Sequence, residues 1–237
     1  MEKFEAHADR FGIDKYSMQE IQNIEIEGDM KTVETSEYIF KAKTIIIATG
    51  AQPKKLGIKG EKEFLSRGVS YCAVCDGAFY KDKTVAVIGG GNAAVEEGTY
   101  LTKFAKKVYI IHRRDDLRAD KVEFIWNTIP LEIQGSNLVE KLVIKNVKTD
   151  EVSELSIDGV FPYIGFSPNT ENLDGKLDQN EQGFICCNAN LETSIDGVFV
   201  AGDVRVTPLR QVVTAAADGA VAGFSCVKYL ENQTVKV

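Results

Sequence analysis

The chain has 237 residues, 44% of them apolar and 27% charged, which is enough to bury a core without disulfides or metal ions. Its net charge of −7 at pH 7 argues against a nucleic-acid-binding surface, which needs clustered lysine and arginine. No charged-then-apolar leader opens the chain, and runs such as TIIIATGA fall far short of the roughly 20 apolar residues of a membrane span. We therefore expect a cytoplasmic protein.

The first fifty residues predict one helix followed by strands. Apolar residues at helical spacing from Phe4 to Phe11 predict a short helix that ends at Gly12. Alternating and β-branched runs over residues 21–48 predict strands. The unbroken run TIIIA favours a strand that is covered on both faces, and Thr49-Gly50 forms the tight exit from it.

The clearest unit is KTVAVIGGGNAAVEEGTYLTKFAKKVYIIHRR. It predicts a strand over Val85–Ile88, a helix that follows a glycine loop, and a second strand over Val108–Ile111. A strand–helix–strand unit of this length has parallel strands and a right-handed crossover. The predicted inner stripe of the helix consists of Ala94, Gly98, Leu101 and Ala105.

The remainder is rich in strand patterns and closes with a long helix. Short strands separated by turns are predicted over residues 123–164. The segment SIDGVFVAGDV predicts another buried strand, which ends at Gly202-Asp203. A helix is predicted from about Leu209 onward. Its apolar stripe consists of Val213, Ala217, Ala220, Phe224 and Val227.

One connection in this order is unusually short. Only eight residues separate Arg114 from Glu123, where the next parallel strand is expected. Such crossovers normally take a dozen or more residues and include a helix. We therefore expect no helix to cover this part of the sheet, either because the sequence omits stretches of a longer parent chain or because the protein is a reduced variant.

The loop Gly89-x-Gly91-x-x-Ala94 has the composition of a dinucleotide site. Gly89 permits a tight turn, Gly91 lets the backbone approach a pyrophosphate, and Ala94 lets the helix pack on the strand. The helix N-terminus directs free N–H groups toward the phosphates. Because strand, loop, helix and second strand occur in the required order, we predict dinucleotide binding, with a purely structural unit as the alternative.

A basic cluster follows the second strand, where NAD-binding enzymes carry an acidic side chain for the ribose. Guanidinium groups match a phosphate in charge and geometry, so the cluster favours the 2′-phosphate of NADP. Asp115 and Asp116 lie within it and leave a solvated charged loop as the alternative. The cluster consists of His112, Arg113, Arg114 and Arg118.

Two of the five cysteines, Cys72 and Cys75, are separated by two residues and followed by Asp76. Five cysteines are too few for a secreted disulfide framework, and in a reducing compartment such a pair can cycle between dithiol and disulfide. Asp76 can supply or remove a proton beside a departing thiolate. Inert buried cysteines are one alternative; a zinc site is another, but it would need further ligands, for which Cys186-Cys187 are the only candidates.

A dithiol and NADPH need a mediator, because hydride leaves a carbon atom as an electron pair whereas a disulfide accepts electrons at sulfur. A flavin is the usual mediator. Gly202-Asp203, directly after a buried strand, is a candidate part of an FAD site, since the aspartate can bind a hydroxyl of the flavin's polyol chain.

Six ordered motifs resemble the low-molecular-weight thioredoxin reductases of bacteria: CAVCDG, GGGNAAVEEG, HRRDDLRA, GFSPNT, GVFVAGDV and RQVVTAAADGAVA. The resemblance covers essentially the whole chain. It implies an α/β homodimer with two Rossmann-like nucleotide-binding domains, in which an NADPH domain with the redox cysteines interrupts an FAD domain. By position it implies FAD-domain parts at residues 1–53 and 165–237 around an NADPH-binding domain at residues 54–164.

The resemblance also implies a role for each matching residue. Cys72 and Cys75 would be the redox pair and Asp76 the acid. The pyrophosphate of NADPH would lie on Gly89, Gly91, Asn92 and Ala94, and its 2′-phosphate on Arg113, Arg114 and Arg118. FAD would contact Thr49, Gly50, Asp203, Arg210, Gln211 and Val212.

The implied activity is that of an NADPH-dependent flavoprotein disulfide reductase. Electrons would pass from NADPH through FAD to the Cys72–Cys75 disulfide and on to thioredoxin or a thioredoxin-like protein. The family begins with a Gly-x-Gly-x-x-Gly segment for FAD that this sequence lacks, so we expect an incomplete FAD domain. The alternatives are a non-catalytic NADP-binding remnant without flavin and a flavin thioredoxin reductase that takes electrons from ferredoxin.

Overall fold

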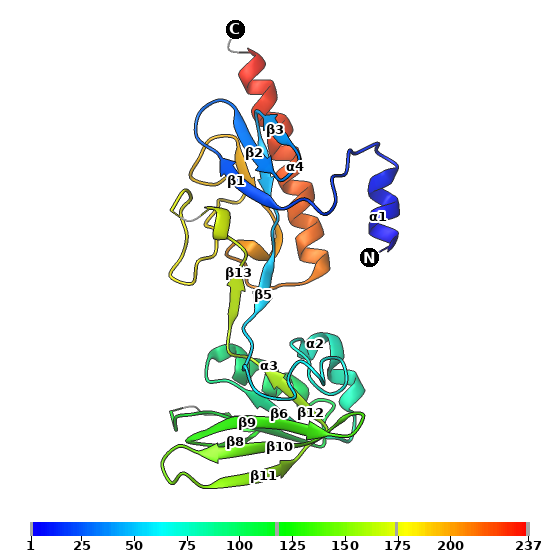
Figure 1. Ribbon diagram of the computed structural model, residues 1–237, viewed down its shortest axis with the longest axis vertical. Coiled ribbons are helices and arrows are strands. Elements are labelled where there is room, and N and C mark those ends of the chain that lie inside the picture. Colours follow the sequence, from blue (N-terminus) through cyan, green and yellow to red (C-terminus); the bar gives the residue numbers. More distant parts are fainter. Residues whose placement is uncertain (1, 117–118, 174, 236–237) are drawn as a thin grey trace. The chain divides into compact units, whose positions relative to one another are not determined.

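The structure is a computed structural model that describes residues 2–116, 119–173 and 175–235 (Figure 1). The chain divides into two compact units, the first formed by Met1–Ala51 with Pro168–Val237 and the second by Gln52–Ser167. None of the described helices is both long enough and apolar enough to cross a membrane. Each unit has hydrophobic clusters of its own.

The second unit is built around a parallel sheet that is covered on both faces. Its elements are α2 (Ala73–Asp76), η1 (Gly77–Tyr80), β6 (Thr84–Ile88), α3 (Asn92–Leu101), β7 (Lys107–Ile111), β8 (Glu123–Ile125), β9 (Thr128–Gly135), β10 (Val139–Asn146), β11 (Val152–Ser156) and β12 (Gly159–Pro162). The parallel strands lie in the order β12-β6-β7-β8, and a separate antiparallel sheet has the order β11-β10-β9. The α/β class and the strand–loop–helix–strand unit are confirmed.

Alternate side chains of β6 explain why its sequence is unbroken and apolar. Val85 and Val87 pack in the cluster that includes α3, whereas Ala86 and Ile88 pack in the cluster that includes β9 and β10. Figure 1 shows α3 and the antiparallel sheet on opposite sides of the parallel strands. A strand covered on both faces has no polar positions, which removes the usual alternation.

The short connection between β7 and β8 joins parallel strands, as expected. In its described residues, 112–116 and 119–122, there is no helix. Phe124 on β8 and Trp126 after it stack at 4.2 Å between ring centroids, and Val122 and Phe124 pack against the cluster beneath α3. These half-buried side chains close part of the face that a crossover helix would otherwise cover.

The first unit contains a short parallel pair and an antiparallel meander. Its elements are α1 (Glu2–Asp9), β1 (Ile21–Glu25), β2 (Lys31–Thr35), β3 (Ile39–Ala42), β4 (Ile45–Ile47), η2 (Glu171–Leu173), β14 (Val198–Val200), η3 (Gly202–Val204) and α4 (Val212–Val235). Strand β14 pairs with β4 in parallel, and β1, β2 and β3 form the meander. The meander and the parallel pair share one hydrophobic cluster, which includes Ile24, Ile47 and Val200.

Two sequence expectations for this unit differ from the structure. The middle residue of β4, Ile46, is exposed, so the expectation that this strand is covered on both faces is wrong. The apolar stripe of α4 is not its buried face: Phe224 and Val227 are exposed, whereas Ala222 and Cys226 pack against Phe199 of β14. Because α4 carries small or apolar residues nearly all round, its periodicity does not define which face is buried.

The two chain passes that connect the units are short strands. Strand β5 (Ala51–Pro53) pairs with β13 (Phe166–Pro168), as Figure 1 shows. Just beyond this pair, the Lys54 N–H donates to the Gly165 carbonyl at 2.9 Å. The second unit is therefore an insertion whose two ends leave side by side.

Candidate functional site: a redox disulfide beside a glycine loop

Cys72 and Cys75 are bonded to each other in the second unit. Cys72 is the N-cap of α2, and its Sγ accepts the Cys75 N–H at 3.1 Å. A hydrogen bond from Asp76 N–H to the Cys72 carbonyl, at 3.1 Å, closes the turn. Cys75 is exposed, so the disulfide is accessible to a reactant.

The Asp76 carboxylate is tied to this turn by Ser70. The Ser70 hydroxyl donates to Asp76 Oδ2 at 2.7 Å and accepts the Cys72 N–H at 3.1 Å. Ser70 is only 6% exposed, so its position is fixed. Sequence reasoning missed Ser70, and its one signal is its place two residues before the first cysteine. The contact holds the predicted acid next to the cysteine pair.

Tyr163, which follows β12, connects the disulfide turn to the glycine loop. Its hydroxyl accepts the Ala73 N–H at 2.6 Å, and its own N–H donates to the Ile88 carbonyl at 2.7 Å. A Cβ atom at Gly89 would lie 2.3 Å from the Tyr163 carbonyl oxygen, so only glycine fits there. The redox turn and the glycine loop thus contact one residue, Tyr163, the first through its side chain and the second through its backbone; sequence reasoning also missed it.

The three glycines of the loop have different surroundings. A Cβ at Gly90 would lie 1.8 Å from Cε1 of His112, whereas at Gly91 it would have no heavy atom within 4 Å. Gly91 is the N-cap of α3, and Ala94 is buried against the sheet. The lower side of the loop is therefore filled by protein, and its outer side is open to a phosphate group at the start of the helix.

The structure divides the basic cluster into a buried and an exposed part. His112 is 6% exposed beneath Gly90, and its Nε2 lies 3.3 Å from Asp116 Oδ1. Arg113 is exposed, and Arg114 Nε pairs with Asp116 Oδ2 at 3.1 Å. Arg118 lies outside the described residues. Both described arginines are accessible to a phosphate, while the imidazole supports the loop from below.

In the first unit, the Thr49-Gly50 turn is fixed by Asn169. The Thr49 hydroxyl donates to the Asn169 carbonyl at 2.6 Å, the Asn169 amide donates to the Thr49 carbonyl at 2.8 Å, and Asn169 N–H donates to the Gly50 carbonyl at 3.0 Å. Gly50 has a φ of +75°, which favours glycine. The motif GFSPNT thus holds a turn that lies 120 residues away in the sequence.

The Gly202-Asp203 turn is held by a partly buried ion pair. Gly202, with a φ of +76°, donates its N–H to Asp218 Oδ2 at 3.0 Å. Asp218 also accepts two hydrogen bonds from Arg205, at 2.6 and 2.7 Å, and the two side chains are 19% and 13% exposed. The bonds from Arg205 lower the pKa of Asp218. Neither partner was a candidate from the sequence.

Asp203 and Arg210 share this half-buried surface. Burial raises the pKa of the Asp203 carboxyl, and the positive charge of Arg210 opposes that rise. The Arg210 guanidinium lies 4.2 Å from the centroid of the Phe184 ring. Gln211 donates its N–H to the Thr214 hydroxyl at 3.2 Å, and Val212 is exposed at the start of α4. These residues supply a charge-bearing surface of the kind that a flavin's polyol and phosphate groups require.

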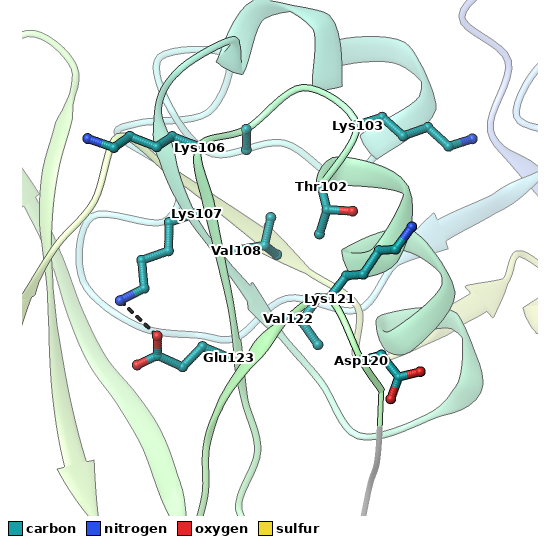
Figure 2. A pocket seen from close by; sticks show the side chains of 10 residues that line it. Thr102, Lys103, Lys106, Lys107, Val108, Asp120, Lys121, Val122 and Glu123 are labelled. Carbon is teal, nitrogen blue, oxygen red and sulfur yellow. Dashed lines mark ion pairs between the residues drawn. The ribbon is translucent and has the colours of Figure 1, made fainter.

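Among the described residues of the second unit, two cavities bear on where the redox site lies. One of about 350 Å³ reaches the redox turn and is lined by Ser70, Asp76, Phe79 and Tyr80 among others. The other, of about 670 Å³, is shown in Figure 2 and is lined by four lysines, among them Lys107, which pairs with Glu123 at 2.8 Å. It lies at the amino ends of β7 and β8, whereas the glycine loop follows the carboxyl end of β6. The larger cavity is therefore not part of the redox site.

Comparisons with known proteins agree with this geometry. A model of the family described as pyridine nucleotide-disulphide oxidoreductase matches residues 5–219. The chain is 43% identical to a thioredoxin reductase of Peptoclostridium acidaminophilum, over 98% of this chain and 78% of that protein. It is 45% identical to the thioredoxin reductase of Bacillus subtilis (strain 168), over 95% of this chain and 75% of that protein.

Solved structures give the same result. The crystal structure of thioredoxin reductase from Streptococcus pyogenes MGAS5005 matches with a TM-score of 0.86 and 44% identity, over 97% of this chain and 79% of that chain. Thioredoxin reductase from Giardia duodenalis matches with a TM-score of 0.88 and 35% identity. The resemblance therefore extends from the motifs to the fold.

Proposed function

Because this chain belongs to the pyridine nucleotide-disulphide oxidoreductases, and among them to the bacterial low-molecular-weight thioredoxin reductases, we propose that it is an NADPH-dependent disulfide reductase. The reducible group is the Cys72–Cys75 disulfide. The protein that it reduces in turn is thioredoxin or a thioredoxin-like protein, in keeping with the exposure of Cys75. Three further cysteines are free thiols, which fits work in the reducing cytoplasm.

One observation carries this proposal: the disulfide turn and the glycine loop share Tyr163. A nucleotide loop and a reducible disulfide held in one unit fit a protein that passes electrons from a nucleotide to sulfur. FAD, when bound, accepts hydride from NADPH and passes the electron pair on to sulfur. Asp76, held by Ser70, supplies the proton when the S–S bond breaks.

We assign the cofactors to the residues whose surroundings fit them. NADPH would lie on the open side of Gly91, with Asn92 and Ala94 at the start of α3 and its 2′-phosphate on Arg113 and Arg114. FAD would contact the first unit. The residues proposed for it are Thr49, Gly50, Gly202, Asp203, Arg210, Gln211 and Val212.

We further propose that the first unit is the FAD domain and the second the NADPH domain. The paired strands β5 and β13 then form the hinge by which the disulfide meets flavin and protein substrate in turn. The functional form is a homodimer, which light scattering of the purified protein tests: twice the chain mass of 26.1 kDa is expected.

Anaerobic spectroscopy tests the proposed function. The purified protein, soaked with FAD, should show flavin bands that NADPH bleaches, and it should then reduce the disulfide of an added thioredoxin. A protein without flavin bands after soaking would instead be a non-catalytic NADP-binding remnant. Flavin bands that NADPH does not bleach but reduced ferredoxin does would place the protein among ferredoxin-linked reductases.

A further inference from the structure

Ser70 contacts both ends of the disulfide loop through one hydroxyl group. The Cys72 N–H donates to its Oγ at 3.1 Å, and the same Oγ lies 2.7 Å from Asp76 Oδ2 and 3.4 Å from the Cys72 carbonyl oxygen. A hydroxyl group has one proton, and a carboxylate at the shorter distance is the stronger acceptor for it. The serine therefore donates to Oδ2 and leaves Asp76 Oδ1 as the oxygen that can carry a proton.

Ser70 is itself fixed to the parallel sheet. Its N–H donates to the Val160 carbonyl at 3.0 Å, and the Val160 N–H donates to the Gly68 carbonyl at 2.8 Å. Val160 lies on β12 and is fully buried. This connection to the sheet does not pass through the S–S bond. The hydroxyl group should therefore keep its position after reduction, when the two sulfur atoms separate.

The carboxylate of Asp76 depends on this serine for its orientation. Asp76 follows Cys75 directly, and its N–H donates to the Cys72 carbonyl at 3.1 Å, so the side chain starts within the redox turn. Of the residues that the structure describes, Ser70 alone donates a hydrogen bond to this carboxylate. The half-buried side chain lines the cavity of about 350 Å³, where it has room to rotate.

We infer that Ser70 is a positioning residue for proton transfer at the Cys72–Cys75 disulfide: it holds Asp76 by one carboxylate oxygen so that the other moves a proton between thiols. In this step an attacking thiol gives its proton to Asp76 and bonds to one sulfur. The S–S bond breaks, its electron pair stays on the other sulfur, and Asp76 passes the proton to that sulfur. The inference rests on the proposed function for the role of this disulfide, but the step needs neither FAD nor NADPH.

The rate at which dithiothreitol reduces the full chain, measured between about pH 6 and pH 9, tests the inference. Two electrons and two protons pass to the protein, and dithiothreitol closes its own cyclic disulfide. The cysteines that can be alkylated, counted by mass spectrometry, rise from three to five. An unassisted rate follows the thiolate concentration and rises about tenfold per pH unit below the thiol pKa of about 8.5. With assistance from Asp76, the wild-type rate should rise less steeply.

Ser70→Ala should show the steep pH dependence of the unassisted reaction. At about pH 6 we expect it to react about tenfold more slowly than wild type, and at about pH 9, where thiolate is abundant, within about twofold. Ser70→Thr keeps a hydroxyl group and should keep the shallow profile, which gives a second test if the alanine variant does not fold. A wild-type profile in Ser70→Ala, or a steep profile in folded Ser70→Thr, would overturn the inference.

A double-mutant cycle separates this role from the contact of Ser70 with the Cys72 N–H. The variant Ser70→Ala/Asp76→Asn should react as slowly as Asp76→Asn and no more slowly, because the serine acts through the carboxylate. If alanine slowed the Asp76→Asn protein by a further factor of about ten, the serine would act on the backbone of the turn instead, and the inference would be wrong.

Matched controls line the same cavity. Ser66→Ala and Asp158→Asn change residues of the same two types, and neither residue forms a hydrogen bond with the redox turn in the described part of the chain. Both variants should keep the wild-type pH profile.

Failure of this inference is distinct from failure of the proposed function. A protein with the expected rate profiles but without flavin bands that NADPH bleaches would retain the role of Ser70 and lose the proposed electron source. A protein whose flavin is bleached by NADPH, but whose Ser70→Ala variant keeps the wild-type profile, would retain the function and lose the role of Ser70.

Discussion

Asp218 accepts three hydrogen bonds at once, from the Gly202 N–H and from two N–H groups of the Arg205 guanidinium. Removing one member of such a pair leaves a poorly solvated charge. Because both side chains retain some solvent contact, we expect Arg205→Ala to lower the free energy of unfolding by about 2 kcal/mol, less than for a fully buried pair. Denaturant titration measures this loss, and Lys145→Ala, which breaks an exposed pair with Asp150, should cost far less.

The Arg205–Asp218 pair also makes the free energy of unfolding depend on pH. The folded pKa of Asp218 is lowered, so its stabilising effect is complete above the unfolded pKa of about 3.9 and is lost as the pH falls through the folded value. The stability gap between wild type and Arg205→Ala should therefore close below about pH 4. A gap that persists at that pH would show that the arginine acts by packing alone.

The pKa of Glu97, on α3, shifts in the opposite direction to that of Asp218. Its folded pKa is raised, so the folded state favours the protonated acid, and stability falls as the pH rises through the folded value. We expect Glu97→Gln to be more stable than wild type at pH 8 and equal to it below about pH 4, where the acid is protonated in both states. Chemical unfolding across this pH range measures how the two free energies of unfolding diverge as the pH rises.

Arg113 and Arg114 test the choice of nucleotide. Charge-assisted hydrogen bonds to a phosphate contribute about 1.5 to 3 kcal/mol, so replacing both by alanine should weaken NADPH binding at least tenfold. NADH, which lacks the 2′-phosphate, should bind nearly as before. Calorimetry with the two nucleotides measures both constants, and equal losses would mean that the basic cluster has another role.

Motif residues could be predicted from the sequence, but their supports could not. Cys72, Cys75 and Gly89 carry local signals, because chemistry and tight turns demand those residue types at fixed spacing. Tyr163 and Asp218 lie 90 and 16 residues from the groups that they hold, and a tyrosine or aspartate alone has many other uses. Only the folded chain brings these partners together.

The glycine loop between β6 and α3 offers a prediction that separates folding from binding. A methyl group at Gly90 would overlap His112, so Gly90→Ala should destabilise the protein by about 1 to 3 kcal/mol. A Cβ at Gly91 meets no other atom, so Gly91→Ala should cost no more than about 1 kcal/mol, the usual loss when alanine replaces a favoured N-cap residue. It should nevertheless weaken NADPH binding, because the methyl group stands where the phosphate approaches. Thermal unfolding and nucleotide titration of both variants check this. As a control, Gly219→Ala, inside α4, should raise stability slightly and leave NADPH binding unchanged.

The elements were predictable to different degrees. Strand β6 and helix α3 were predicted correctly, because a buried strand, a glycine loop and an amphipathic helix each restrict which residues can occur. For α4 the helix was predicted correctly, but its buried face was not. Small residues such as Ala222 can pack against a strand as easily as Phe224 can. Periodicity identifies a helix, whereas its partner decides which side is covered.

The two units, joined by two chain passes, should not unfold as one. Trp126, the one tryptophan in the sequence, lies in the second unit, so its fluorescence reports that unit alone, whereas circular dichroism reports both. We expect the two signals to give different denaturant midpoints. Gly90→Ala should then lower the denaturant midpoint of tryptophan fluorescence more than the midpoint of circular dichroism. Coincident midpoints in wild type and variant would contradict independent units.

The hydrogen bond between Lys54 and Gly165 closes the second unit at its base. Because its two ends lie side by side, such a segment can be inserted into a loop of another protein without stretching either terminus. Residues 54–165 would take the thiol chemistry and the nucleotide loop with them as one transplantable module.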